Sequence, residues 1–235
     1  MKMVNIQHLY FVVDVDIKGF FDNVNHAKLM RQMWSLGIQD KRLLCIIKEM
    51  LKAPVVLPSG EKIYPDKGTP QGGILSPLLS NIVLNELDWW VSSQWEDIPT
   101  HTVIKEGTAK NGTPNRSNKC RTLRRSNLKE MYIVRYADDF RIFCRKRSDA
   151  VKTYHAVKQW LEERLKLQIS EEKSKVVNLK KNYSEFLGFK LKAVPRGNKH
   201  IVRSHMCDKA IQNTTKKLKA QIDYIQHPVN CKEEY

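Results

Sequence analysis

Two pairs of aspartates stand at the ends of apolar segments and are the residues best suited to chemistry. Asp14 and Asp16 close an alternating apolar segment, and Asp138-Asp139 separates two further segments of the same kind. If these segments are neighbouring strands of one sheet, both pairs lie at the same edge. Clustered carboxylates favour Mg²⁺, a hard cation that binds carboxylate and phosphate oxygens. Two such ions can activate a 3′-hydroxyl and stabilise a pyrophosphate leaving group in an in-line displacement.

Each aspartate also has a simpler interpretation. An isolated Asp-Asp pair is usually a polar hairpin turn, but here apolar strand residues flank the pair on both sides in a strongly basic chain. Asp14 has the same strand parity as Asp16, so both point to the same face, and only one of them need bind a metal. Asp22 is expected to be a turn or capping residue after Phe20-Phe21.

A glycine-rich loop, GTPQGG, spans Gly68–Gly73. It lacks the lysine of a Walker loop and does not lie between a parallel strand and a helix, so it is a weak candidate for a phosphate-binding loop. One interpretation is a connection to the following helix, for which Ser76-Pro77 is expected to supply the N-cap and a proline in the first turn. The alternative is a loop whose backbone approaches a nucleotide or template base, with Gln71 offering a bidentate amide.

The periodicity of the remaining sequence predicts the elements that hold these groups. Strand-like alternation and helical spacing follow one another without a strict βαβ order, which favours an α+β fold with helices on one face of a sheet. Strands are expected at 9–16, 131–136, 140–145, 175–179, 185–193 and 200–203, with a short hairpin at 54–64. Helices are expected at 26–36, after an Asp40 cap, after Ser76, at 149–165, and in a last segment with Ile211, Thr214, Leu218, Ile222 and Ile225 on one face. Trp89, Trp90 and Trp95 are expected in the core.

Charge is distributed unevenly along the chain, whose formal net charge is +16. Residues 1–98 contain 10 Lys/Arg and 11 Asp/Glu, whereas residues 99–235 contain 31 and 14. Residues 100–127, rich in Thr, Asn, Gly and Ser, are expected to form a basic surface loop or insertion. A neutral front half and a basic back half indicate a polyanionic partner, most simply nucleic acid.

Composition excludes several classes of protein. With 41% hydrophobic and 28% charged residues, the chain is neither a disordered tail nor a collagen-like polymer. It has no apolar run of membrane-spanning length, and its start does not resemble a signal peptide. The five cysteines include no CxxC pair and no group with zinc spacing, which indicates a reduced, intracellular setting.

Three segments together resemble the palm motifs of group II intron-encoded reverse transcriptases. They are DIKGFFDNVNH (Asp16–His26), GTPQGGILSPLLSNIVLNELD (Gly68–Asp88) and YADDF (Tyr136–Phe140). The later SEEKSK (Ser170–Lys175) and FLGF (Phe186–Phe189) are similar to the following blocks of that family, and their order and spacing match. The resemblance covers about residues 8–192, and five blocks in order are more specific than YADD alone. Diversity-generating and abortive-infection reverse transcriptases share several blocks and are near neighbours.

The resemblance implies an α+β reverse transcriptase palm over residues 1–192, with an antiparallel sheet backed by helices and a basic insertion at about 100–127. Residues 193–235 would begin a helical thumb. The implied activity is that of an RNA-directed DNA polymerase, which extends a DNA primer on an RNA template with dNTPs and two Mg²⁺ ions, for which Mn²⁺ can substitute. Intron RNA binding and splicing assistance would accompany it. The alternative is a catalytically inactive maturase fragment that binds RNA.

The resemblance also assigns roles around the metals. Asp16 and Asp138 would be metal ligands, and Asp139 would be a third acid that tunes or shares the site. The backbone of Ile17 would face a metal. Lys173 matches a position proposed to donate a proton to the pyrophosphate leaving group, although a solvated lysine is the simpler interpretation.

Further roles concern nucleotide and nucleic acid. Phe20 or Phe21 would pack under the incoming sugar and exclude ribonucleotides, and core packing is the alternative for either. Gln71 and the adjacent Gly72 would line the nascent base pair, and Phe186–Phe189 would form the hairpin that grips the primer strand. Basic residues would hold intron RNA or the template–primer backbone in a salt-sensitive manner. They are Arg116, Lys119, Arg121, Arg124, Arg125, Lys216 and Lys217.

The chain departs from the family at both ends. The family normally has a fingers region well upstream of the first motif, which here lies close to the start of the sequence. We expect either a truncated or split intron protein, or fingers supplied by a separate polypeptide or a homodimer partner. The thumb also stops early, without a nuclease domain. The expected location is the bacterial cytoplasm, associated with the nucleoid and without membrane contact.

Overall fold

The computed structural model describes residues 2–70, 73–100, 107–108, 112, 114–115 and 117–226. Within these ranges, the centre of the fold is a four-stranded sheet with the order β6-β7-β1-β8. Neighbouring strands are antiparallel throughout this sheet, which confirms the predicted fold class. The strands are β1 (Phe11–Val15), β6 (Met131–Tyr136), β7 (Asp139–Cys144) and β8 (Lys175–Asn178).

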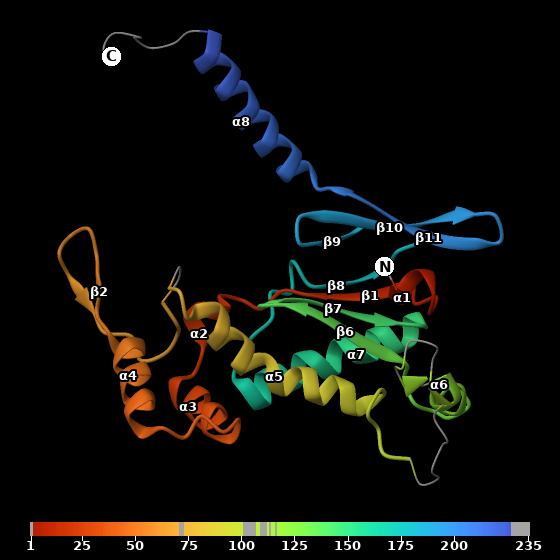
Figure 1. Cartoon of the computed structure of the whole chain (residues 1–235), viewed down its shortest axis with the longest axis horizontal. Coiled ribbons are helices and arrows are strands. Elements are labelled where there is room, and N and C mark those ends of the chain that lie inside the picture. Colours follow the sequence, from red (N-terminus) through yellow and green to blue (C-terminus); the bar gives the residue numbers. More distant parts are fainter. Residues whose placement is uncertain are drawn as a thin grey trace.

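Two long helices cover one face of this sheet (Figure 1). Helix α5 (Ser76–Gln94) packs on β6, whereas α7 (Arg147–Trp160) packs on β1 and its two neighbouring strands. A π-helical segment, Leu161–Leu165, continues α7, so the two together match the helix predicted at 149–165. The hydrophobic core includes fully buried side chains from both helices and from β7, among them Leu84, Leu87, Phe140, Ile142 and Val157.

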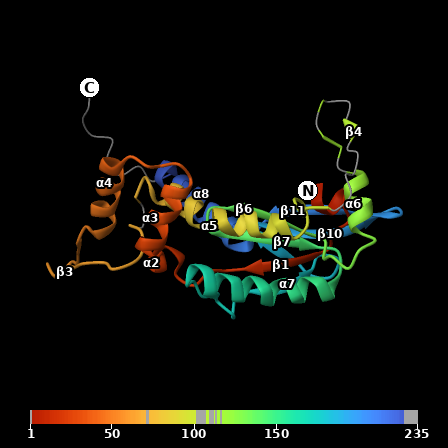
Figure 2. The same cartoon turned by 90° about the horizontal axis from the view of Figure 1, so that it is seen from below.

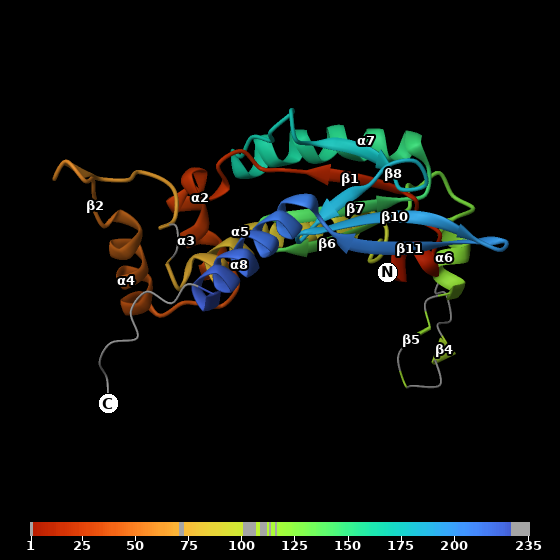
Figure 3. The ribbon, with the colours of Figure 1, turned by 90° about the horizontal axis from the view of Figure 1, so that it is seen from above.

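A three-stranded sheet with the order β11-β10-β9 lies over the opposite face, and Figure 3 views it from above. Its strands are β9 (Ser184–Phe186), β10 (Phe189–Arg196) and β11 (Lys199–Met206). Helix α1 (Lys2–Asn5) is tied to this sheet because Val202 N donates a hydrogen bond of 2.8 Å to Asn5 Oδ1. Since both faces of β1 are covered, four consecutive residues, Val12 to Val15, are buried.

The single strand predicted at 185–193 is wrong, because a turn divides it into β9 and β10. Leu187 and Gly188 adopt φ values of 51° and 76°, in the left-handed region, and the backbone reverses there. The two strands then pair antiparallel, with Phe186 opposite Phe189. Alternation alone could not reveal this turn, because the FLGF sequence remains apolar across it.

The segment between β1 and α5 forms a separate group of helices at one end of the molecule (Figure 2). It contains α2 (Phe20–Asn23), α3 (His26–Ser35), α4 (Lys41–Lys52), and a short hairpin of β2 (Val55–Val56) and β3 (Lys62–Ile63). Asp40 caps α4 as predicted, since its carboxylate accepts hydrogen bonds from the backbone of Arg42 and Leu43.

Two local predictions in α5 are wrong. Ser76 is not the N-cap, because Leu75 occupies that position and the Ser76 hydroxyl donates instead to the carbonyl of Pro70. Trp89 is not in the core, because 66% of it is exposed. Trp95 is buried, and Trp90 is half-buried and stacks on the ring of Trp160. Of the three tryptophans predicted in the core, only Trp95 is therefore fully buried.

The basic insertion and the basic C-terminal helix are attached to the rest of the fold in different ways. Within the insertion, the described part contains β4 (Gly107–Thr108), β5 (Pro114–Asn115) and α6 (Ser117–Leu123), which lies at the end of the sheet away from α4 (Figure 1). Helix α8 (Asp208–Gln226) rises away from the sheet, and none of its residues is buried. Among the helices described, none combines the length and apolar composition that a bilayer span requires.

A buried carboxylate fastens the insertion to the sheet. Glu130, 4% exposed, accepts hydrogen bonds from Arg124 after α6 and from Arg145 after β7. Arg145 also donates to the carbonyl of Gln7, 2.8 Å away, and so ties the N-terminal segment to the same point. Burial raises the pKa of Glu130, but the hydrogen bonds and charges of Arg145 and Arg124 prevail and hold it below its ordinary value.

Replacing Glu130 by Gln should lower the free energy of unfolding near neutral pH by about 2 kcal/mol, because hydrogen bonds to a charged group are lost. Since the folded-state pKa is lowered, this contribution is present above the unfolded-state pKa and disappears as the pH falls through the folded-state pKa. Urea unfolding should therefore show that the difference in free energy of unfolding between wild type and variant shrinks as the pH falls from neutral to acidic. Glu49→Gln, at an exposed position, is the control. A difference that is constant with pH would contradict the assignment.

Candidate active site

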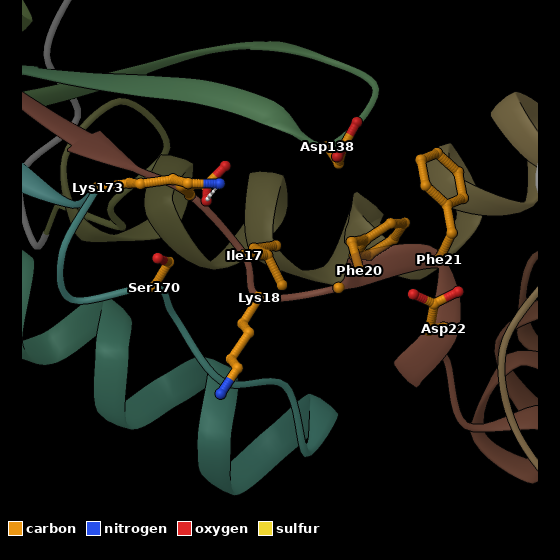
Figure 4. A pocket seen from close by; sticks show the side chains of 10 residues that line it. Ile17, Lys18, Phe20, Phe21, Asp22, Asp138, Ser170 and Lys173 are labelled. Atoms are coloured by element: carbon orange, nitrogen blue, oxygen red, sulfur yellow. Dashed lines mark ion pairs between the residues drawn. The ribbon is translucent and has the colours of Figure 1, made fainter.

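A polar cavity of about 270 Å³ opens where β1 ends beside the β6–β7 turn (Figure 4). Asp16 and Asp138 both line it, although they are far apart in the sequence. The strand register brings the two aspartates together. Val15 pairs with Phe140, so Asp16, the next residue after β1, lies beside the turn that contains Asp138. The predicted convergence of carboxylates at one sheet edge is confirmed for these two side chains.

The backbone around Asp16 is fixed by the loop between α7 and β8. Asp16 N donates to Ser174 Oγ at 3.1 Å, and the carbonyl of Asp16 accepts from Ser170 N at 2.8 Å. The Asp16 carboxylate itself is 47% exposed and faces the cavity, where Lys173 Nζ lies 3.5 Å from Oδ2. Figure 4 shows this ion pair as a dashed line. The carboxylate is thus held in position by its backbone while remaining open to a ligand.

Asp138 lies in a tight turn between β6 and β7. The preceding Ala137 has a φ of 53°, in the left-handed region that a residue with a Cβ rarely adopts. Arg135 stabilises this conformation, because its Nη1 donates to the Ala137 carbonyl at 2.8 Å. The same guanidinium binds the carboxylate of Asp88 in α5, with Nε 2.9 Å from Oδ1. The turn is therefore anchored to the helix beneath the sheet.

Asp139 points elsewhere, since successive strand residues face opposite sides. It is not among the residues that line the cavity; its Oδ1 lies 2.6 Å from Nη1 of Arg141. Arg141 also contacts Asp14, its partner across the β1–β7 pair. Burial raises the pKa of the Asp14 carboxyl to about 6, although Arg141 and the hydroxyl of Ser184 act in the opposite direction.

The two phenylalanines of the first motif have different environments. Phe20 is 2% exposed and belongs to the core, whereas Phe21 is half-buried. Both border the cavity, and their rings meet edge to face with centroids 5.2 Å apart. Figure 4 shows the ring of Phe21 on the same side of the cavity as Asp138. Phe21 is therefore the one of the pair with a face available to a ligand.

The glycine-rich loop is docked on the segment that carries Phe21. Thr69 N donates to the Phe21 carbonyl at 2.6 Å, and His26 Nε2 donates to the Gly68 carbonyl at 2.6 Å. Gly68 has a φ of 94°, and a Cβ at this position would lie 2.9 Å from the Phe21 carbonyl oxygen. Only glycine fits this approach. Gln71 and Gly72, the predicted nucleotide contacts, lie outside the described residues.

None of the predicted nucleic-acid contacts that the structure describes lines the cavity of Asp16 and Asp138. Lys119, Arg121, Arg124 and Arg125 line a second cavity of about 870 Å³ beside α6, at the other end of the sheet. Arg124 is also engaged with Glu130. Exposed lysines of α8 include Lys216 and Lys217, and Arg116 lies outside the described residues. The basic residues of the insertion thus line a different cavity from the one that Asp16 and Asp138 line.

Sequence reasoning missed the polar residues that hold the site. Ser174 and Ser170 fix the Asp16 backbone, Arg135 supports the turn, and Arg141 and Ser184 surround Asp14. The one available signal was the position of Arg141, two residues after Asp139 and therefore on the same strand face. The serines become visible only when the loop after α7 and the second sheet are in place.

The cavity of Asp16 and Asp138 has oxygen groups that suit a divalent metal. Hard cations require oxygen donors, and the carboxylates of Asp16 and Asp138 share this cavity with the residue Ile17. Ile17, whose backbone carbonyl is the further oxygen expected at this site, also lines the cavity. No group of three closely placed His, Cys, Asp or Glu side chains occurs among the described residues. A metal would therefore depend on these two carboxylates, the backbone and its own substrate or water ligands.

Comparison with known proteins identifies the family. Residues 2–191 match the profile of the family "Reverse transcriptase (RNA-dependent DNA polymerase)". Group II intron-encoded protein LtrA of Lactococcus lactis subsp. cremoris is 30% identical over 211 residues, covering 77% of this chain and 34% of that protein. Protein YkfC of Escherichia coli strain K12 is 29% identical over 189 residues, covering 77% of this chain and 46% of that protein. The chain therefore spans less than half the length of these relatives.

Solved structures show the same fold. Apo telomerase from Candida tropicalis superposes with a TM-score of 0.53 at 12% sequence identity, covering 78% of this chain and 31% of that chain. The sheet carrying the two carboxylates lies within the residues that match the family profile. The chain belongs to the reverse transcriptase (RNA-dependent DNA polymerase) family and is related to group II intron-encoded proteins.

Proposed function

We propose that the chain is the palm of an RNA-directed DNA polymerase of the group II intron type, which extends a DNA primer on an RNA template with dNTPs. One observation carries this proposal: Asp16 and Asp138, from separate motifs, line a single cavity beside Phe21. Such an arrangement suits phosphoryl transfer, in which positioning and charge stabilisation supply most of the catalysis. Membership of the family and the relationship to LtrA support it.

Asp16, Asp138 and the Ile17 carbonyl would hold Mg²⁺, or Mn²⁺ in its place. When bound, two such ions would lower the pKa of the primer 3′-hydroxyl and neutralise charge on the triphosphate. Asp139, whose carboxylate pairs with Arg141 beside the site, would adjust the electrostatic potential at the metals. Lys173, which is exposed and lies 3.5 Å from Asp16, would donate a proton to the departing pyrophosphate.

Nucleotide selection would depend on the docked loop and the aromatic pair. Phe21 would lie under the incoming sugar and exclude a 2′-hydroxyl, and Phe20 would support it from the core. Gln71 and Gly72 would line the nascent base pair. The attachment of Gly68 and Thr69 to the Phe21 segment supports this role, because it holds the loop next to the cavity.

Residues 1–192 would form the palm, and residues 193–235 would begin the thumb. The exposed lysines of α8, together with the basic insertion and its Arg116, would bind template–primer or intron RNA through phosphate contacts. The alternative is a maturase fragment that binds intron RNA without polymerising, to which the basic cavity beside α6 would contribute.

Asp16→Asn and Asp138→Asn should each reduce primer extension on poly(rA)/oligo(dT) by more than about 100-fold, because each removes a carboxylate charge needed to stabilise the transition state. RNA affinity should remain at the wild-type level, since the basic surfaces are elsewhere. Asp66→Asn, at an exposed position, is the matched control. Extension and RNA binding by the 235-residue chain are measured side by side.

Two results would count against this assignment in different ways. Retained extension by either pure variant would show that the carboxylate is not essential. RNA binding by the wild-type chain without any dNTP incorporation would favour the maturase alternative over the polymerase.

Phe21→Val should increase the use of rNTPs relative to dNTPs by about tenfold or more, because a smaller side chain leaves room for a 2′-hydroxyl. Single-nucleotide incorporation with matched dNTP and rNTP measures the ratio. Phe20→Val is the comparison variant and should mainly lower the free energy of unfolding, because Phe20 is 2% exposed. A change in sugar selection with Phe20→Val alone would reverse the two roles.

A further inference from the structure

Arg141 is a nearly enclosed cation next to the catalytic turn. It lies on β7, two residues after Asp139, and its side chain is 13% exposed. A charged group removed from water needs partners both for its charge and for its N–H donors. The partners of this guanidinium come from three different strands, and neither polymerisation nor RNA binding as proposed above explains them.

The contacts of Arg141 point in three directions. Nη1 lies 2.6 Å from Oδ1 of Asp139, on the same strand. Nε lies 3.0 Å from Oδ1 of Asp14 on β1, without the alignment of a hydrogen bond. Nη2 donates to the backbone carbonyl of Glu185 on β9. The ring of Phe186, also on β9, lies 5.5 Å from the guanidinium carbon.

Asp14 is itself held by the second sheet. It is 5% exposed, and the hydroxyl of Ser184 on β9 lies 2.8 Å and 3.1 Å from its two carboxylate oxygens. Asp14 therefore cannot turn toward the cavity without leaving the buried Ser184 hydroxyl without this acceptor and breaking its ion pair with Arg141. Asp14 therefore orients Arg141, and the contacts of Asp14 with Arg141 and Ser184 connect β1 with β7 and β9.

The other flank of the turn is anchored independently. Arg135 on β6 binds the carbonyl of Ala137 and the carboxylate of Asp88 in α5. Arg141 is thus the anchor on the side of the second sheet, whereas Arg135 is the anchor on the side of the helices. A two-residue turn with a left-handed alanine depends on such contacts to keep a single conformation.

We propose that Arg141 is a positioning residue that couples the catalytic turn to the β9–β10 hairpin. By holding Asp139 against the second sheet, it fixes the orientation of the adjacent Asp138 toward the cavity. By binding the Glu185 carbonyl, it makes the position of the hairpin depend on the position of the turn. The inference rests on the proposed polymerase function for its catalytic consequence, but not for the coupling itself.

Arg141→Met should lower the kcat of primer extension by about 100-fold, because small displacements of reacting groups carry penalties of this size. The KM for dTTP should stay within about twofold, since the docked loop and Phe21 that would bind the nucleotide are unchanged. Arg141→Lys keeps the charge but lacks the fork that reaches three partners, so it should recover only part of the rate.

Arg145→Met is the matched control, because Arg145 follows the other end of β7 and also pairs with a buried carboxylate, that of Glu130. It should lower stability with little effect on kcat. Equal losses of kcat in Arg141→Met and Arg145→Met would overturn the proposal, as would a raised KM with an unchanged kcat.

Hydrogen exchange of the 235-residue chain tests the coupling without polymerase activity. Arg141→Met should accelerate exchange in peptides covering both the turn at 136–140 and strand β9 at 184–187, whereas Arg145→Met should accelerate neither. Unchanged exchange in either peptide would overturn the coupling. A wild-type chain that fails to polymerise would contradict the proposed function, and the exchange data would still decide whether Arg141 links the turn to the hairpin.

Discussion

The antiparallel pairing of β1 with β7 is the constraint on which the rest of the structure depends. Its register sets Val15 opposite Phe140, so the end of β1 and the β6–β7 turn share one edge of the sheet. A slip of one residue would exchange the β1 side chains that face the helices with those that face the second sheet. Asp14 would then lose Ser184 and Arg141, which makes the register strongly specified. Burial of both faces of the sheet therefore determines where two acidic side chains meet.

The site combines a rigid frame with open reactive groups. Backbone hydrogen bonds and buried ion pairs lie below and beside the carboxylates, whereas Asp16 remains 47% exposed and lines a polar cavity. Groups prepared for a hard cation need this combination, because side chains must be held in place yet reachable from solvent. Four basic residues of the insertion, Lys119, Arg121, Arg124 and Arg125, line a different cavity and do not border this one.

Much of this arrangement could be predicted from the sequence. The strands, most helices and the Asp40 cap follow from local patterns, and the motifs led to Asp16, Asp138 and the pair Phe20-Phe21. What could not be predicted depends on packing between distant segments. The contact of Ser184 with Asp14 requires the second sheet, and the exposure of Trp89 requires knowing which side of α5 the sheet covers. The turn at Leu187-Gly188 does not follow from alternation, because apolar residues flank it on both sides, but the family motif FLGF did predict a hairpin there.

The isolation of α8 has a mechanical consequence. A helix of 19 residues is about 28 Å long, and this one is joined to β11 through Cys207 without any buried side chain along its length. Its start is attached to the second sheet, because Cys207 N donates to the Gly188 carbonyl and Asp208 pairs with Lys190 of β10, 2.6 Å away. A rotation of about 10° about this attachment would move the far end of the helix by about 5 Å, given that length. The contacts at the first end of α8 thus set how far its lysines stand from the sheet.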